Sequence, residues 1–227
     1  MTSSARLTSL PDGEPELDAR QRLLLAAERL FGETGYKAVS LRQLGAAAGV
    51  NTALIGYYFG GKEGLFTEAY RMNAKPINAE RSQRLRALMQ GPLPPTLEQV
   101  LRTWIEPVFL HDAAGERHLF IRMMAFLADE RQPFYEELVF STHGATNAAF
   151  LDVLQGLLPA LSRGTLMWRL YFLIGMFSVA TKGRPAGMFR LSGGKAAEPD
   201  PQRNLTYMLD FALAGFQAPD SGSDTPS

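Results

Sequence analysis

The chain of 227 residues carries 23 acidic and 23 basic side chains, and 46% of its residues are hydrophobic. This is the composition of an ordinary globular protein with a sizeable core. The absence of cysteine excludes disulfides, thiol redox chemistry and cysteine-ligated metal sites. The longest apolar run, 170–180, is shorter than the ~20 residues of a membrane span. Residues 1–18 hold no apolar signal core, and a cytoplasmic protein without membrane contact is expected.

The first elements are a polar tail and a long helix. Residues 1–17 contain prolines and a glycine among polar side chains, which predicts a disordered tail. Asp18 is placed to cap a helix that continues to Glu33. Between residues 19 and 75 there are eight basic and four acidic side chains. Such a local excess favours attraction to nucleic-acid phosphates, although an excess of this size also arises by chance.

Two short helices joined by a tight turn are predicted next, within residues 40–60. Ser40 and Gln43 form a capping-box pattern at the start of the first helix. Helical spacing assigns its buried stripe to Leu41, Leu44 and Ala48. Gly49 suits the left-handed residue that ends a helix. The glycines at positions 60 and 61 are expected to end the second helix.

The second helix begins near Asn51 or Thr52, and either residue can cap it. The spacing places Ile55, Tyr58 and Phe59 on its buried face. The outward positions are Thr52, Ala53, Gly56 and Tyr57. A two-turn helix that shows small, polar and aromatic side chains after a glycine turn suits a DNA major groove. The competing interpretation is an αα-hairpin within a bundle, which leaves an exposed tyrosine unexplained.

The run A-A-A-G-V-N, then I-G-Y-Y-F and G-G-K-E-G-L-F, resembles the helix-turn-helix signature of the tetracycline-repressor (TetR) family of bacterial transcription regulators. The resemblance covers residues 20–70. The family often has tyrosine where this chain has Gly56, and histidine or tyrosine at position 58. A subgroup with I-N-Y-H-F-G-G-K-E is more similar to this chain, which gives Tyr57 the aromatic role in the groove.

The resemblance implies a set of DNA-contacting residues. Ser40, Tyr57 and Lys62 would hold phosphates, whereas Arg42 and Gln43 would lie near the backbone or a base edge. Thr52 and Ala53, at the start of the recognition helix, are placed to read a thymine methyl group. Because these side chains are short, DNA shape is expected to contribute to specificity. The full set of candidate DNA-binding residues is Ser40, Arg42, Gln43, Asn51, Thr52, Ala53, Tyr57, Tyr58 and Lys62.

Further helices follow Lys62, with a predicted break or kink at Lys75 and Pro76, because proline removes a donor and disfavours helix before it. The helix of 165–181 is nearly all apolar, which predicts burial on most sides. Residues 183–201 read as a loop. The other predicted helices are 62–72, 79–90, 97–110 (after a Thr96 and Gln99 capping box), 116–130, 134–158 and 204–216.

These elements predict an all-α protein. An N-terminal three-helix helix-turn-helix DNA-binding domain is followed by a larger helical domain for effector binding and dimerisation. The predicted ranges are a disordered tail at 1–17, the DNA-binding domain at 18–75, the effector-binding and dimerisation domain at 76–217, and a disordered tail at 218–227.

The family resemblance also implies a small-molecule effector, and the Met-rich aromatic helices of the second domain suit an apolar or amphipathic one. For any single aromatic or methionine side chain of these helices, packing in the core or between subunits is an equally good explanation. Arg122, between apolar neighbours, suits an acidic headgroup, and the competing interpretation is a surface or salt-bridging arginine. The candidate pocket residues are Trp104, Phe120, Met123, Met124, Leu127, Trp168, Phe172 and Met176.

One recognition helix reads half a site, so a homodimer on a two-fold DNA operator is expected, with the helices of 134–158 and 165–181 as candidate interfaces. Enzyme motifs are missing, and no cofactor or metal is expected; His111, Asp112 and Glu116 are a poor metal set. The hypothesis is a ligand-responsive regulator, most often a repressor in this family. The alternative is a helical ligand- or partner-sensing protein that no longer binds DNA.

Overall fold

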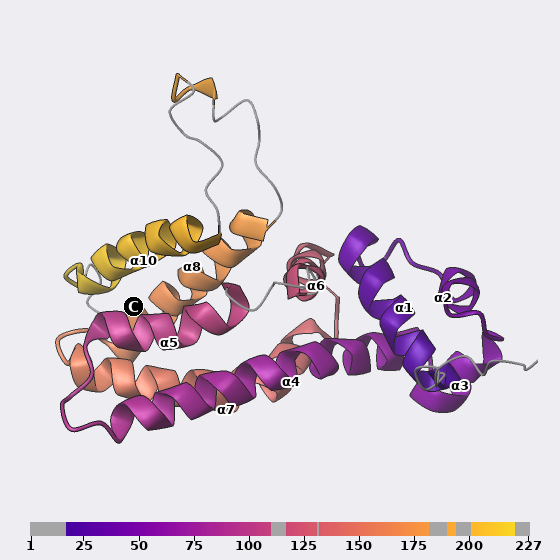
Figure 1. Ribbon diagram of the computed structural model, residues 1–227, viewed down its shortest axis with the longest axis horizontal. Helices are drawn as coiled ribbons and strands as arrows, with labels where there is room; N and C mark the ends of the chain where they lie inside the picture. Colours follow the sequence, from indigo (N-terminus) through magenta and orange to yellow (C-terminus); the bar gives the residue numbers. More distant parts are fainter. Residues whose placement is uncertain (1–16, 110–116, 131, 182–189, 194–200, 221–227) are drawn as a thin grey trace, which may run out of the picture.

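The computed structural model describes residues 17–109, 117–130, 132–181, 190–193 and 201–220. Every regular element within these ranges is a helix (Figure 1), which confirms the predicted all-α architecture. The predicted N-terminal tail up to residue 16, most of the loop of 183–201 and the last seven residues lie outside the described part, as do His111, Asp112 and Glu116.

The helices divide into a small head, a long connecting helix and a larger body (Figure 1). The connecting helix α4 runs between the head at one end of the molecule and α5, α7, α8 and α10 at the other. The head consists of α1 (Ala19–Thr34), α2 (Leu41–Ala48), α3 (Ala53–Phe59) and the start of α4 (Lys62–Met89). The body contains α5 (Leu97–Phe109), α6 (Arg117–Glu130), α7 (Tyr135–Leu157), α8 (Arg163–Thr181) and α10 (Pro201–Gln217).

The core of the head is closed by aromatic and aliphatic side chains from four helices. Phe31 of α1 and Phe66 of α4 pack edge to face with ring centroids 5.0 Å apart. Leu44 of α2 and Ile55 of α3 are fully buried beside them. Leu41, predicted in the same stripe as Leu44, is instead 43% exposed. The buried residues of α2 are Leu44, Gly45 and Ala48, so packing centred on the small Gly45 turns Leu41 outward.

Of the two outcomes predicted at Lys75 and Pro76, a break or a kink, the break is wrong, because α4 is one helix of 28 residues with Pro76 inside it. A proline within a helix removes one hydrogen bond and costs about 3 kcal/mol. Burial of Ala74 and Ile77 on either side of Pro76 offsets that cost. The predicted domain boundary therefore falls in the middle of a continuous helix that belongs to both the head and the body.

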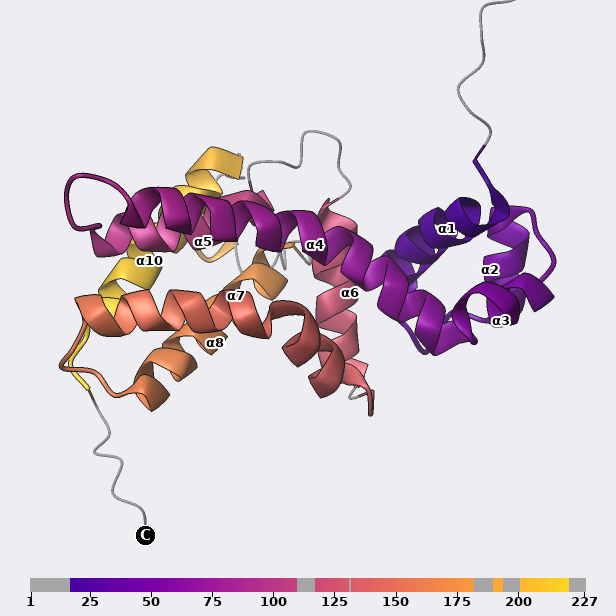
Figure 2. The same ribbon diagram turned by 90° about the horizontal axis from the view of Figure 1, so that it is seen from below.

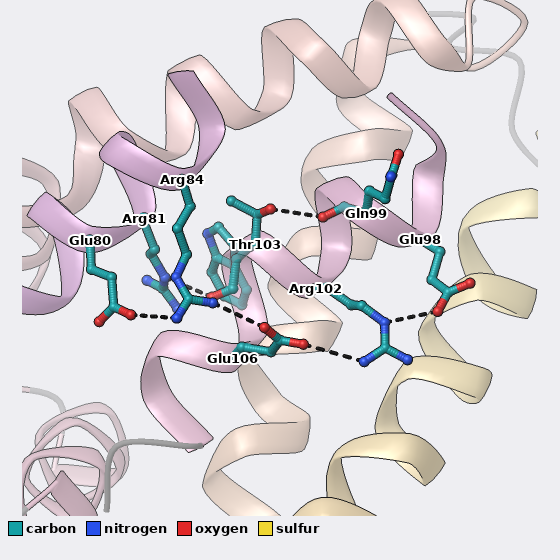
Figure 3. Close-up of polar contacts among 9 residues, drawn as sticks. Glu80, Arg81, Arg84, Glu98, Gln99, Arg102, Thr103 and Glu106 are labelled. Atoms are coloured by element: carbon teal, nitrogen blue, oxygen red, sulfur yellow. Dashed lines mark hydrogen bonds and ion pairs between the residues drawn. The ribbon is translucent and has the colours of Figure 1, made fainter. Parts of the chain in front are cut away.

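A polar network joins α4 to α5 (Figure 3). Arg84 is bonded to Glu80 at 2.7 Å and to Glu106 at 3.0 Å, and Glu106 also accepts from Arg102 at 3.3 Å. These partly exposed ion pairs contribute little individually. Only the Arg84–Glu106 pair crosses from α4 to α5, whereas the pairs of Arg84 with Glu80 and of Arg102 with Glu106 each lie within one helix.

Arg81 lies beneath this network and is almost completely buried. Its Nε donates to the backbone oxygen of Trp104 at 2.8 Å, and its guanidinium lies 4.0 Å from the centroid of the Trp104 ring. Burial lowers the pKa of Arg81 to about 9. Removing one partner of such a buried contact leaves the other polar group buried without a hydrogen-bond partner, which destabilises the fold. Trp104, predicted to line a pocket, is thus occupied in packing α4 onto α5.

The eight predicted pocket residues do not share one location. Phe120, Met123 and Leu127 of α6 are buried in the core, like Trp104, and Met124 and Met176 are partly buried. Trp168 and Phe172 of α8 are each 62% exposed, so the structure does not place these two residues in an enclosed pocket. The predicted burial of α8 on most sides is likewise corrected, because Trp168, Tyr171 and Phe172 are all exposed. Because α8 is apolar around its circumference, periodicity could not indicate which face the body covers.

The predicted C-terminal tail of 218–227 lies partly within the described residues. The described residues extend to Asp220, beyond the expected start of the tail at residue 218. The Asp220 carboxylate accepts from the backbone N–H of Ser162 at 3.1 Å and from the hydroxyl of Thr165 at 2.7 Å. It thereby satisfies donors at the start of α8, where an acidic group is favourable.

A buried hydrogen-bond chain links α4 to α7. Tyr70 Oη lies 2.8 Å from His143 Nε2, and His143 Nδ1 lies 3.1 Å from Asn78 Oδ1. Asn78 donates through Nδ2 to the backbone oxygen of Thr142 at 2.8 Å, which turns its carbonyl oxygen toward the histidine. That oxygen can only accept, so His143 carries its proton on Nδ1 and accepts from the tyrosine at Nε2. A neutral imidazole satisfies every member of this chain, whereas an imidazolium would take away the acceptor of the Tyr70 hydroxyl hydrogen.

The neutral imidazole predicts a pH-dependent stability. Burial, and secondarily the charge of Arg81, lowers the pKa of His143 from 6.5 to about 4. Because the unfolded chain binds the proton more tightly, the folded protein is expected to lose stability as the pH falls from 6.5 toward 4, by on the order of 3 kcal/mol. Urea unfolding at stepped pH measures this slope.

His143→Gln is the matched variant for this measurement, because glutamine keeps hydrogen-bonding capacity and does not titrate. Its stability is expected to be lower at neutral pH and to change less between pH 6.5 and 4 than that of the unaltered protein. Equal slopes in the two proteins would show that His143 is not the group responsible.

Candidate nucleic-acid interface

The start of α2 is held by the predicted capping box. The backbone N–H of Gln43 donates to Ser40 Oγ at 3.3 Å, and the backbone N–H of Ser40 donates to Gln43 Oε1 at 2.8 Å. This reciprocal pair satisfies donors that the first turn of a helix leaves open. Ser40, Arg42 and Gln43 are all exposed beside it.

The turn between α2 and α3 depends on glycine at two places. Gly49 has φ 64° and ψ 36°, the left-handed conformation predicted for it. At Gly45, an added Cβ would lie 2.7 Å from Cγ2 of Thr52 and 3.0 Å from the backbone oxygen of Val50. The two helices can therefore approach closely only because position 45 has no side chain.

Asn51 and Thr52 take different roles at the start of α3. The backbone N–H of Ala53 donates to Asn51 Oδ1 at 2.8 Å, whereas the Thr52 side chain makes no capping bond. Of the two predicted caps, Asn51 is thus the one that acts. Thr52 and Ala53 are exposed, which leaves the first turn of α3 accessible from outside.

The recognition helix α3 buries one face and presents the other to solvent. Ile55 is fully buried, and Tyr57 is 80% exposed. Tyr58, which the spacing placed on the buried face, is 39% exposed and packs edge to face on Tyr57 with centroids 5.0 Å apart. A seven-residue helix has room for a narrow buried face, which Ile55 and the partly buried Phe59 fill. Figure 2 shows α2 and α3 at the outer end of the head, away from the body.

Lys62 begins α4 directly after two glycines with positive φ, Gly60 and Gly61. Its Nζ lies 4.2 Å from the centroid of the Tyr36 ring, a cation–π contact. Burial lowers the pKa of Lys62, and the nearby Glu130 carboxylate partly offsets that effect. Any phosphate contact by Lys62 has to be made from this half-buried position.

Two residues of α6, Arg122 and Glu130, connect the body to the head. The sequence did not indicate this role. The carboxylate of Glu130 accepts from the backbone N–H of Lys37 through both oxygens, at 3.1 and 3.0 Å. Arg122 donates to the backbone oxygen of Glu33 at 2.9 Å, which joins α6 to the end of α1. These partners are about 90 residues apart in sequence, and no local pattern could have indicated them.

The head as a whole has the geometry of a DNA reader. A short helix protrudes with its polar and aromatic side chains exposed, and Ser40, Arg42 and Gln43 lie exposed on the helix before it. Arg20 is paired with Glu68, whereas Arg42 is exposed on α2, the helix before α3. The described residues contain no group of three or more potential metal ligands, and no described helix has the length and apolar character needed to span a bilayer.

Two family models match the chain. The model of the bacterial regulatory proteins of the tetR family matches residues 23–69, which are the head. The model described as the tetracyclin repressor-like C-terminal domain matches residues 102–215, half of the chain. The chain belongs to the TetR family. It is accordingly a helix-turn-helix DNA-binding transcriptional regulator and not an enzyme, as the sequence analysis predicted.

Individual relatives agree with the TetR assignment. The regulator BetI of Vibrio atlanticus (strain LGP32) is 28% identical over 156 residues, 58% of this chain and 76% of that protein. BetI of Vibrio parahaemolyticus serotype O3:K6 is 34% identical over 76 residues, 34% of this chain and 38% of that protein. The fatty acid degradation regulator FadR of Bacillus halodurans has the same fold, with a TM-score of 0.54 and 16% identity over 90% of this chain and 99% of that one.

Proposed function

We propose that this TetR-family regulator is a cytoplasmic homodimer that represses transcription from a two-fold operator and is released by a small-molecule effector. The observation that carries the DNA-binding part is the exposure of α3, on which Tyr57 is 80% accessible. Tyr57 and Tyr58 together present two aromatic side chains on the exposed face of this helix, where their hydroxyl groups can contact a DNA backbone. Residues 40–62 provide both phosphate-binding and base-reading side chains.

The dimer is supported by an aromatic surface on α8 and α10. Three aromatic rings of α8 pack on one another, those of Trp168, Tyr171 and Phe172. The centroid of the Trp168 ring lies 5.8 Å from the centroid of each of the other two rings. Tyr207 and Phe211 of α10 are exposed as well, and α10 lies beside α8 in Figure 1. An exposed aromatic patch of this kind is typical of a subunit interface. The proposed interface therefore uses α8, one of the two helices expected from sequence, together with α10.

Coupling between the body and the head follows from the continuity of α4. The same helix begins next to α3 and packs against α5 and α7 in the body. An effector that favours one packing of the body over another would therefore change the separation of the two heads on DNA. It can do so only through a difference in its affinity for the two arrangements.

The DNA-binding proposal predicts distinct effects at Tyr57 and Lys62. DNA fragments selected by the purified protein from a random pool provide the operator, and fluorescence anisotropy measures affinity at several salt concentrations. Tyr57→Ala is expected to weaken binding at least tenfold. Lys62→Ala is expected to weaken binding and to reduce the salt slope by about one per half-site.

Arg86→Ala is the matched control for the lysine variant, because Arg86 is an exposed cation on α4 near its far end. It should leave both affinity and salt slope unchanged. Unaltered operator affinity in both head variants would contradict the assignment of the interface, and the absence of any selected DNA would favour a sensor that does not bind DNA.

A further inference from the structure

An open polar groove lies between α4 and α7, which run side by side in Figure 2. Its volume is about 410 Å³, within the range of sites for small molecules. Its walls contain no acidic residue and a single apolar one. The lining residues are Arg71, Lys75, Asn78, Ala79, Ser82, Ser141, Thr142 and Thr146.

Two positively charged side chains, Arg71 and Lys75, line the α4 side of this groove. Arg71 and Lys75 are exposed and one helical turn apart, a spacing at which like charges repel. Arg71 donates through Nη2 to Ser141 Oγ on α7 at 3.1 Å. Among the ion pairs of the described residues, neither cation has an acidic partner. The groove therefore has a positive charge that its own walls do not balance.

The α7 side supplies hydroxyl groups. Ser141, Thr142 and Thr146 come from this helix, and Ser82 faces them from α4. The Thr142 hydroxyl oxygen is buried and makes no hydrogen bond with the described residues. Asn78, which also lines the groove, is held on both sides, by the backbone oxygen of Thr142 and by the buried His143. Asn78 and Ser141 already donate to backbone oxygens of α7, so the hydroxyl groups that can donate to a ligand are those of Ser82, Thr142 and Thr146. Such donors next to two cations favour a ligand with several acceptor oxygens.

We infer that this groove binds a small hydroxylated anion, whose phosphate or carboxylate group is held by Arg71 and Lys75 and whose hydroxyl groups contact the serine and threonine side chains. The regulatory role of this site rests on the proposed function. A ligand bound between α4 and α7 would favour one position of α4, the helix that carries the head, over another. It differs from the apolar or amphipathic effector expected from the sequence.

Isothermal titration calorimetry of the full chain at fixed ionic strength tests the site. The probes are glycerol 3-phosphate, citrate and, as the uncharged comparison, glycerol. Saturable binding is expected for at least one anion and not for glycerol, and which anion binds distinguishes a phosphate from a carboxylate ligand. The double variant Arg71→Gln with Lys75→Gln is expected to bind that anion at least tenfold more weakly.

Both substituted side chains are exposed and without ion pairs among the described residues, so the double variant should fold, which its circular dichroism melting curve checks. Arg86→Gln, a cation on α4 that does not line the groove, should bind like the unaltered protein. Equal binding in the double variant, or no saturable binding of either anion, would overturn the site. So would a double variant that loses operator affinity without any anion present, since the two cations would then contact DNA.

Operator affinity measured with and without the bound anion separates this inference from the proposed function. Anion binding without any DNA binding would leave the groove site intact and remove the regulator. DNA binding without anion binding would do the reverse. An anion that binds at the groove and leaves operator affinity unchanged would overturn its role as an effector.

Discussion

Gly64→Ala is expected to weaken specific DNA binding about a hundredfold while leaving the body folded. In the first turn of α4, a Cβ at position 64 would overlap the backbone oxygen of Phe59, the last residue of α3. A backbone oxygen cannot rotate away as a side chain does, so α3 has to move relative to α4. Overpacking of this kind costs roughly 1–3 kcal/mol or more. A loss of about 3 kcal/mol in binding free energy lowers the affinity by two orders of magnitude.

Fluorescence anisotropy on the selected operator measures the affinity loss, and thermal unfolding followed by circular dichroism reports whether the head melts separately from the body. Gly156→Ala is the matched control, because an added Cβ at this exposed position in α7 meets no atom within 4 Å. It should bind DNA normally and be slightly more stable, since alanine favours a helix by about 1 kcal/mol over glycine. Normal operator affinity in Gly64→Ala would show that the junction of α3 and α4 tolerates displacement.

Phe172→Asp combined with Phe211→Asp is expected to convert the proposed dimer into a monomer. Both rings lie on the outer faces of their helices, 62% and 71% exposed in the single chain. Burying one such side chain is worth roughly 1.5–3 kcal/mol, and two-fold symmetry repeats each substitution in both subunits. Added carboxylates facing a second copy cost further free energy through desolvation. The dissociation constant should rise by at least about four orders of magnitude.

Sedimentation equilibrium measures the association state of this double variant. Leu93→Asp places the same charge at an exposed leucine in the turn between α4 and α5 and should leave the dimer intact. If the double variant remains a dimer, the interface lies elsewhere. A monomeric variant is also expected to lose most of its operator affinity, because a single head contacts only half of a two-fold site.

Much of the head could be predicted because its signals are local. The Ser40 and Gln43 capping box and the left-handed Gly49 involve atoms within a few residues, and the structure confirms them. The second capping box, Thr96 with Gln99, is confirmed for the same reason. Tyr57 was placed outward by helical spacing, and its exposure agrees.

The errors occurred where distant contacts overrode local preference. Proline at position 76 signals a break, but burial of its helix against the body keeps α4 continuous. Asp220 lies in a polar segment that reads as a tail, yet it is anchored by Ser162 and Thr165, more than 50 residues earlier. In α8, a uniformly apolar sequence did not reveal that Trp168 and Phe172 face away from the core.

The amino-acid sequence alone was sufficient for the all-helical class, the capped helix pair that reads DNA and the family, because caps, turns and apolar periodicity act over three or four residues. The three-dimensional packing of remote segments was needed to place Glu130 against Lys37, to bury Arg81 beneath Trp104, and to bring Arg71 and Lys75 beside the hydroxyl groups of α7. Such contacts depend on how whole helices lie against one another, and no short stretch of sequence encodes that arrangement.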